Sequence, residues 1–247
     1  MLLISIQCLI QENICTAINQ LQIQGDGIKN YNPNHINLTL RLQKNKLNYR
    51  SAIALSLAGK QSHLAFQIAS SLVQTLKGQI SPSWLHVAVT PPAWIEFKIT
   101  EAAIQQWLDN SFQEILDSAS MPETIQSLPQ YVRDRCWQLL ELGVRENLIS
   151  LYYPTQSWKI VSLSRNNLLQ EEDWQLLYHL ISTRDRLEQA ASSQQRDKLA
   201  HHLSNAFLEF HRHCQLFNRQ QPNFHQLAVR RFSAIAITER LLFQLGY

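Results

Sequence analysis

The alternation of apolar and polar positions predicts a mixed first half of the chain and an all-helical second half. Residues 2–22 carry leucine or isoleucine at every third or fourth position, the spacing of one helical face. Residues 36–42 alternate apolar and polar side chains, which is typical of a half-buried strand. The elements expected next are two helices, strands over 86–89 and 95–99 joined across Pro91-Pro92, and a helix over 101–118.

One-sided helical stripes dominate the second half. Six apolar residues between Leu199 and Phe217 fall within an arc of about 80° when wound as a helix. Phe210 and Cys214 lie inside this arc and are expected to be buried, whereas Arg212 lies outside it. Further expected elements are helices over 130–140, 171–191 and after Pro222, an extended insertion over 152–161 and a linker at 120–122. The sequence therefore predicts an α+β fold with domains over 1–118 and 122–247.

The composition is that of an ordinary globular protein, with 45% hydrophobic and 17% charged residues. No apolar run is long enough for a transmembrane helix, and the first residues do not have the pattern of a signal peptide. The four cysteines show no paired spacing, which favours reduced thiols and a cytoplasmic location. No membrane partner is expected.

Charge is unevenly distributed along the chain, although the formal net charge is only +3. No acidic residue occurs between Asp26 and Glu96, a stretch that holds seven lysines and arginines. Residues 109–195 hold seven basic and twelve acidic residues, and residues 196–247 hold seven basic and three acidic ones. Two basic ends around an acidic middle favour a polyanion bound at two points, and the alternative is a solvated surface with scattered lysines.

Two parts of the sequence resemble one known family. "KLAHHLSNAFLEFHRHC" and "LAVRRFSAIAITERLLFQLG", near the C-terminus, resemble the DALR anticodon-binding domain of arginyl-tRNA synthetases. "NYRSAIALSLA", read as a helix, with "HLAFQIASSLVQTL" and "HVAVTPPAWIEFKI", resembles the N-terminal additional domain of the same enzymes. Here Pro91-Pro92-Ala93-Trp94 stands where that family has a Gly-Pro-Gly-Phe turn. "QYVRDRCWQLL", over 130–140, resembles the first helix of the family's anticodon-binding domain.

The catalytic part of such an enzyme has no counterpart in this sequence. There is no His-x-Gly-His motif, and the six glycines do not form a phosphate-binding loop. The two flanking domains leave no room for a Rossmann domain. The resemblance therefore implies a protein that is not an enzyme, has no cofactor and binds tRNA, with arginine tRNA as one candidate, either as a chaperone or as an adaptor that presents tRNA to a tRNA-acting enzyme. The alternatives are a protein–protein interaction module that no longer binds RNA and a non-catalytic subunit of a split synthetase.

The resemblance also suggests which residues would contact tRNA. In the N-terminal domain they are four basic residues and one aromatic residue: Arg41, Lys44, Lys46, Arg50 and Tyr49. Tyr49 would serve either for base stacking or for packing. In the helical domain they are Tyr131, Arg133, Arg135, Arg212, Arg230 and Arg231. The last three are expected on the surface, so that replacing all three with alanine would leave the melting temperature nearly unchanged.

The histidines near the C-terminus raise the possibility of a metal site, which helix geometry argues against. Ligands on one helix need a spacing of three or four residues. His211 and His213 would point about 200° apart at helical spacing, and His202 and His213 would lie roughly 16 Å apart along the axis. No metal is therefore expected.

Overall fold

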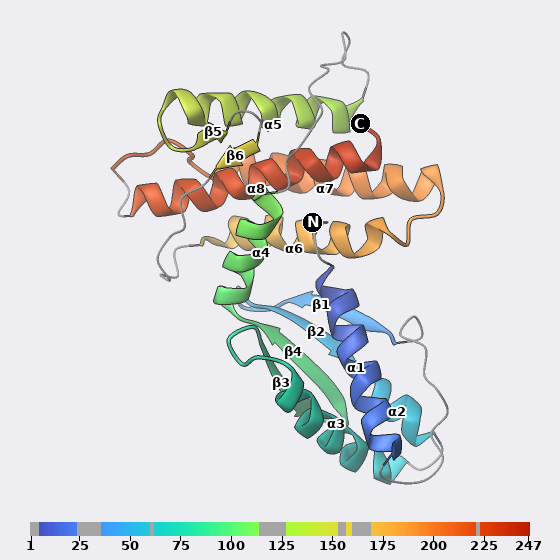
Figure 1. Cartoon of the computed structure of the whole chain (residues 1–247). Coiled ribbons are helices and arrows are strands. Elements are labelled where there is room, and N and C mark those ends of the chain that lie inside the picture. Colours follow the sequence, from blue (N-terminus) through green and yellow to red (C-terminus); the bar gives the residue numbers. More distant parts are fainter. Residues whose placement is uncertain are drawn as a thin grey trace. The chain divides into compact units, whose positions relative to one another are not determined.

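The protein is described here by a computed structural model covering residues 5–23, 36–59, 62–113, 127–152, 157–159, 169–220 and 223–247. It has an α+β fold that divides into two compact units (Figure 1). The sheet unit comprises the described residues of Ser5–Ile104, and the helical unit those of Gln105–Tyr247. The division lies within helix α4, Glu101–Gln113, whereas the linker expected at 120–122 lies outside the described residues.

The sheet unit combines a four-stranded sheet with three α-helices among its described residues. The strands are β1 (Leu38–Leu42), β2 (Leu47–Ser51), β3 (Leu85–Thr90) and β4 (Trp94–Ile99). They lie in the order β1-β2-β4-β3, with antiparallel neighbours. The helices are α1 (Ile6–Ile23), α2 (Ile53–Ala58) and α3 (Ala65–Gln79), with a 3₁₀ turn η2 over Ser62–Leu64.

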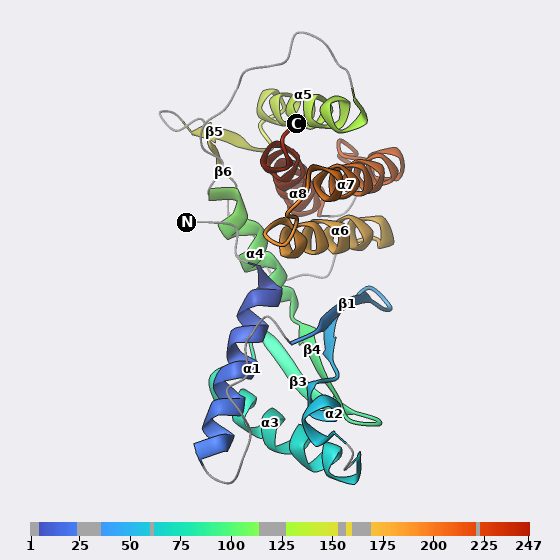
Figure 2. The same cartoon turned by 90° about the vertical axis from the view of Figure 1, so that its right-hand side faces the viewer.

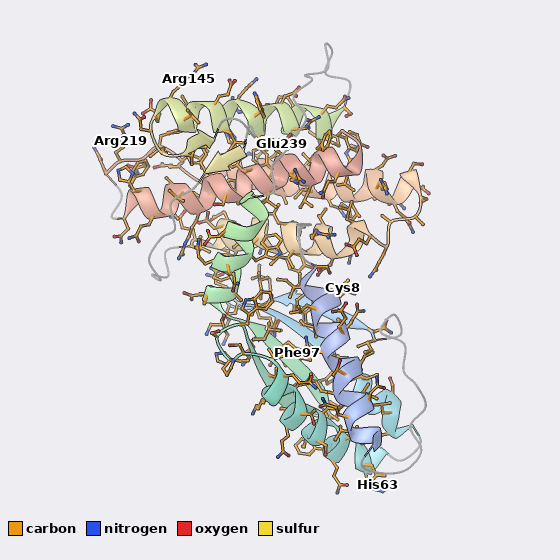
Figure 3. The ribbon with its side chains drawn as sticks, in the orientation of Figure 1. Cys8, His63, Phe97, Arg145, Arg219 and Glu239 are labelled. Atoms are coloured by element: carbon orange, nitrogen blue, oxygen red, sulfur yellow. The ribbon has the colours of Figure 1, made fainter. Side chains whose placement is uncertain are left out.

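One face of this sheet is apolar and buried. Tyr49 and Phe97 are paired across β2 and β4, and neither side chain has exposed surface. Val87, the partner of Phe97 on β3, is also buried. Figure 2 shows α1 and α3 on the same side of the sheet, and Figure 3 labels Phe97 on β4. Because side chains alternate between the faces of a strand, polar residues between these apolar ones lie on the opposite face.

The prediction of a helix from Asn48 onward is wrong for its first residues. Leu47–Ser51 forms strand β2, and helix α2 begins only at Ile53. A tight turn between β1 and β2 sets this arrangement. Gln43 and Lys46 exchange two backbone hydrogen bonds of 3.0 Å. Lys44 and Asn45 between them have φ angles of 49° and 57°, the left-handed conformation that two-residue hairpins require.

The helical unit is a bundle with one central helix. Its elements are α5 (Leu128–Arg145), β5 (Ser150–Tyr152), β6 (Ser157–Lys159), α6 (Glu171–Leu187), α7 (Ser193–His213) and α8 (Phe224–Leu245). Helix α8 packs against α5, α6 and α7. Almost all of its residues from Leu227 to Leu245 are buried, so its polar side chains need partners inside the bundle.

The four helices expected in the second half are confirmed as α5, α6, α7 and α8, with ends shifted by several residues. Phe207 and Phe210 are 0% and 1% exposed, and Cys214 is 5% exposed, as the apolar stripe predicts. The expected extended insertion corresponds to the β5–β6 pair. Among the described residues, no helix is sufficiently long and apolar to cross a lipid bilayer.

Candidate nucleic-acid interface

The polar face of the sheet brings together basic residues from three strands. Strand register places Arg41, Asn48, Lys98 and His86 in one row across β1, β2, β4 and β3. The neighbouring row contains Thr39, Arg50, Glu96 and Ala88. These eight residues and Thr90 make up the polar sheet face. Thr39, His86, Ala88 and Lys98 are exposed, so this face reaches solvent.

Glu96 is the single carboxylate of the polar sheet face and lies near its centre. It accepts a hydrogen bond from Asn48 Nδ2. Its carboxylate oxygens lie 3.5 Å from Arg50 Nε and 3.9 Å from Lys98 Nζ. Arg50 Nη2 also donates to Thr90 Oγ1 at 3.4 Å. Glu96 therefore holds two cations in place, while the Lys98 side chain remains 55% exposed.

Arg41, Lys44 and Lys46 carry charge that Glu96 does not balance. Arg41 is half-buried on β1, and the two lysines are exposed in the turn that follows. In the described part of the chain, no carboxylate forms an ion pair with any of the three. The polar sheet face and its adjoining turn therefore have an excess of positive charge.

Tyr49 cannot serve as a base-stacking platform, which corrects one of the two roles expected for it. Its side chain is 0% exposed and belongs to the apolar face, opposite Arg50 and Asn48. The alternation of strand side chains is the reason, because neighbours in the sequence point to opposite sides. The packing role is the one that its position fits.

In the helical unit, Arg133 on α5 contacts the end of α8 and the last residue of the chain, whereas Arg135 donates to Gln138 Oε1 on its own helix at 3.1 Å. Arg133 Nε donates to Glu239 Oε1 and its Nη1 to the backbone oxygen of Tyr247, both at 2.8 Å (Glu239 is labelled in Figure 3). The guanidinium of Arg133 also lies 4.9 Å from the ring centre of Phe243. Tyr131 and Phe243 are 44% and 40% exposed, so two aromatic rings reach solvent where α5 begins and α8 ends.

Two of the three expected arginines near the C-terminus are not surface residues. Arg212 is 67% exposed and pairs with Glu209 at 2.7 Å. Arg230 and Arg231 are instead 8% and 2% exposed. Arg230 Nε donates to Gln105 Oε1 at 3.1 Å. The expectation that all three lie on the surface is therefore wrong for Arg230 and Arg231, because α8 is buried on nearly all sides.

Helices α6 and α7 form a cavity of about 480 Å³ with an acidic lining. Glu171, Glu172 and Glu209 line it together with His179 and His202. Burial lowers the pKa of His179, and the nearby His202 lowers it further. A neutral histidine among carboxylates makes this cavity unsuitable for a polyanion.

Sequence reasoning missed Lys98, His86 and Glu96. Glu96 was considered only as the end of the acid-free stretch, and the other two lie in strands where no site was expected. The alternation in Trp94–Ile99 was the available signal, because it places Glu96 and Lys98 on one face. Their register with Arg41 and Arg50 required the structure.

Comparisons with protein-family models, with curated proteins and with solved structures found no match for this chain.

Proposed function

We propose that this protein is a non-catalytic relative of the arginyl-tRNA synthetases that binds tRNA as a chaperone or adaptor. The observation that carries the proposal is the excess of positive charge on the polar sheet face. Arg41, Arg50 and Lys98 lie on this face against one carboxylate, Glu96, and the adjoining turn adds two lysines. Phosphate groups are the natural partners of such a surface, because each contact releases counterions from the nucleic acid.

The order of the two units also supports the proposal. A sheet unit followed by a bundle of helices is the organisation that the sequence resemblance implies, with the bundle in the place of a DALR anticodon-binding domain. The exposed rings of Tyr131 and Phe243 give the helical unit groups on which unpaired bases stack. Phosphate contacts do not choose a sequence, so selection of an arginine tRNA rests on the resemblance alone.

A protein partner is the second candidate, and exposed apolar side chains favour it. Phe66 on α3 is 54% exposed, and Leu142 on α5 is 38% exposed. Phe66 belongs to the sheet unit and Leu142 to the helical unit. Single exposed apolar residues of this kind are common on protein surfaces. RNA binding therefore remains the preferred proposal.

The test is the affinity for total tRNA, measured by electrophoretic mobility shift, of a variant that combines Arg41→Gln with Lys98→Gln. Both side chains belong to the row across the polar sheet face, and neither is fully buried. The affinity is expected to fall at least several-fold because two phosphate contacts are lost. Lys77→Gln is the matched control, since Lys77 is exposed on α3, which packs on the other face. If the folded double variant bound tRNA with unchanged affinity, the protein-partner function would become the favoured proposal.

A further inference from the structure

Amide side chains form most of the lining of a second cavity in the helical unit. It has a volume of about 380 Å³ and is lined by Gln170, His213, Gln215, Asn218, Gln220 and Arg231. This volume lies within the range of roughly 300–1,000 Å³ that is typical of small-molecule sites. Four of its six lining residues are glutamine or asparagine, side chains that both donate and accept hydrogen bonds.

Arg231 fixes two walls of this amide cavity. Its Nη2 donates to Gln170 Oε1 at 2.8 Å, and its Nη1 donates to the backbone oxygen of Gln215 at 3.0 Å. The first partner precedes α6 and the second follows α7. Since the Arg231 side chain is only 1% exposed, these contacts hold both segments from inside the bundle.

The segment after α7 is also held by its own polar groups. Asn218 Nδ2 donates to Gln215 Oε1 at 2.8 Å, and Asn218 Oδ1 accepts from the backbone N–H of Gln220 at 3.1 Å. No other described residue bonds to the amide of the Gln220 side chain or to the NH₂ group of Gln215. The cavity therefore has a fixed frame and retains hydrogen-bonding capacity for a ligand.

The chemistry of the lining disfavours two classes of ligand, free anions and guanine bases. Arg231 is neutralised by Asp173, with Nε–Oδ1 and Nη2–Oδ2 distances of 2.8 and 3.0 Å. With that charge compensated, the lining favours a neutral polar ligand over a free anion. The arginine fork is occupied by the carboxylate, so it is not available for the paired contact with O6 and N7 that arginine makes to guanine. A planar ring with hydrogen-bond donors and acceptors along one edge complements these amides.

From this geometry we infer that the amide cavity binds an unpaired adenine base. Asparagine and glutamine recognise adenine through one donor and one acceptor, its amino group and the neighbouring ring nitrogen. Proteins commonly read single-stranded RNA in this way, with the base turned out of its stack. The inference rests on the proposed RNA-binding function for the source of the base, which is a nucleotide of RNA and not free adenosine.

The test compares adenosine with uridine in NMR titrations of the full-length protein, monitoring the side-chain amide signals. Adenosine is expected to shift the signals of Gln215, Asn218 and Gln220, and to bind more tightly than uridine by about five- to 150-fold, the discrimination of one good paired contact. Hexaadenylate is expected to bind at the same place and more tightly than adenosine, because its phosphates add contacts. Equal affinities for adenosine and uridine would overturn the inference. If the protein bound adenosine but not hexaadenylate, the conclusion that the base comes from RNA would be wrong.

A double variant combining Gln215→Ala with Gln220→Ala removes two of the four amide side chains that line the cavity. Both residues are exposed to solvent. It is expected to lose the preference for adenosine and to unfold at the same temperature as the native protein. The matched control replaces two exposed glutamines outside the cavity, Gln138 and Gln194, and is expected to retain the preference. A preference that persists in the first variant contradicts the inference. In the native protein, tRNA binding without any preference for adenosine over uridine would refute this site and leave the proposed function standing, because Arg41 and Lys98 lie in the sheet unit, outside the amide cavity.

Discussion

Arg231 and Asp173 form a buried ion pair that joins the central helix α8 to the first turn of α6. Two hydrogen bonds of 2.8 and 3.0 Å connect the guanidinium with the carboxylate. The two side chains are only 1% and 4% exposed. Asp173 also accepts from the backbone N–H of Gln170 at 2.8 Å, which caps the start of α6. The burial of this pair makes it part of the core of the helical unit.

Replacement of Arg231 by alanine is expected to destabilise the protein by about 3–5 kcal/mol, because the Asp173 carboxylate remains buried without its partner. Urea unfolding would measure the change. Arg212→Ala is the control, since Arg212 is 67% exposed, and is expected to alter stability by less than about 0.5 kcal/mol. Similar stability of the two variants would show that the buried pair does not support the fold.

Gly143 on α5 is closely approached by the ring of Phe232 on α8. A Cβ atom added at this glycine would lie 2.7 Å from Phe232 Cε1. Phe232 is fully buried, so its ring has little room to move. Gly143→Ala is therefore expected to lower the free energy of unfolding by about 1–3 kcal/mol, although alanine favours helices.

The matched control for this substitution is Gly78→Ala on α3, where nothing lies within 4 Å of an added Cβ. This variant is expected to be as stable as the native protein, or more stable by up to about 1 kcal/mol. Thermal unfolding of both variants checks the pair of predictions. A neutral Gly143→Ala would mean that α5 and α8 separate more easily than their packing indicates.

Stability is expected to fall as the pH drops below about 6.5, in part because of His179. Burial lowers the pKa of this histidine from its ordinary value of 6.5, and the nearby His202 lowers it further. Below 6.5 the unfolded chain takes up a proton that the folded protein binds less readily, so folding is disfavoured as the pH falls through that range. His211 contributes in the same direction, because burial lowers its pKa too.

Urea unfolding at pH 7.5 and 5.5 measures this effect, and His179→Gln is the variant that isolates it. The loss of stability between the two pH values is expected to be smaller in this variant than in the native protein. An equal loss in both proteins would assign the pH dependence to other groups.

The protein is expected not to activate arginine. The sequence contains neither a His-x-Gly-His motif nor a glycine-rich phosphate loop, so the groups that would stabilise the adenylation transition state are missing. Arginine-dependent exchange of pyrophosphate into ATP is the measurement. Exchange above that of a blank would refute the non-catalytic part of the proposal.

The fold was largely accessible from the sequence where one periodicity extended over many residues. The stripe through Phe207 and Phe210 correctly predicted both α7 and its buried face. The prediction was wrong over residues 48–51 because the resemblance favoured a helix there, whereas the turn at Lys44 and Asn45 pairs this short segment with β1. The pattern of apolar and polar residues within a short segment does not reveal which strand it pairs with.

The candidate site was accessible only in part. The acid-free stretch directed attention to Arg41 and Arg50, but Lys98 joins them through strand register, which the sequence does not display. Arg230 and Arg231 were misassigned to the surface because arginine is rarely buried without a partner. Their partners, Gln105 and Asp173, lie 125 and 58 residues away in the sequence.

The salt dependence of tRNA affinity tests the central claim most directly. Each phosphate neutralised by the protein adds roughly 0.7–0.9 to the slope of log affinity against log salt concentration. Four to six contacts would give a slope of about −3 to −5, and the variant with Arg41→Gln and Lys98→Gln would have a slope shallower by about 1.4–1.8. Lys77→Gln is expected to keep the native slope. A slope near zero for the native protein, or an identical slope in the double variant, would contradict binding of RNA by the polar sheet face.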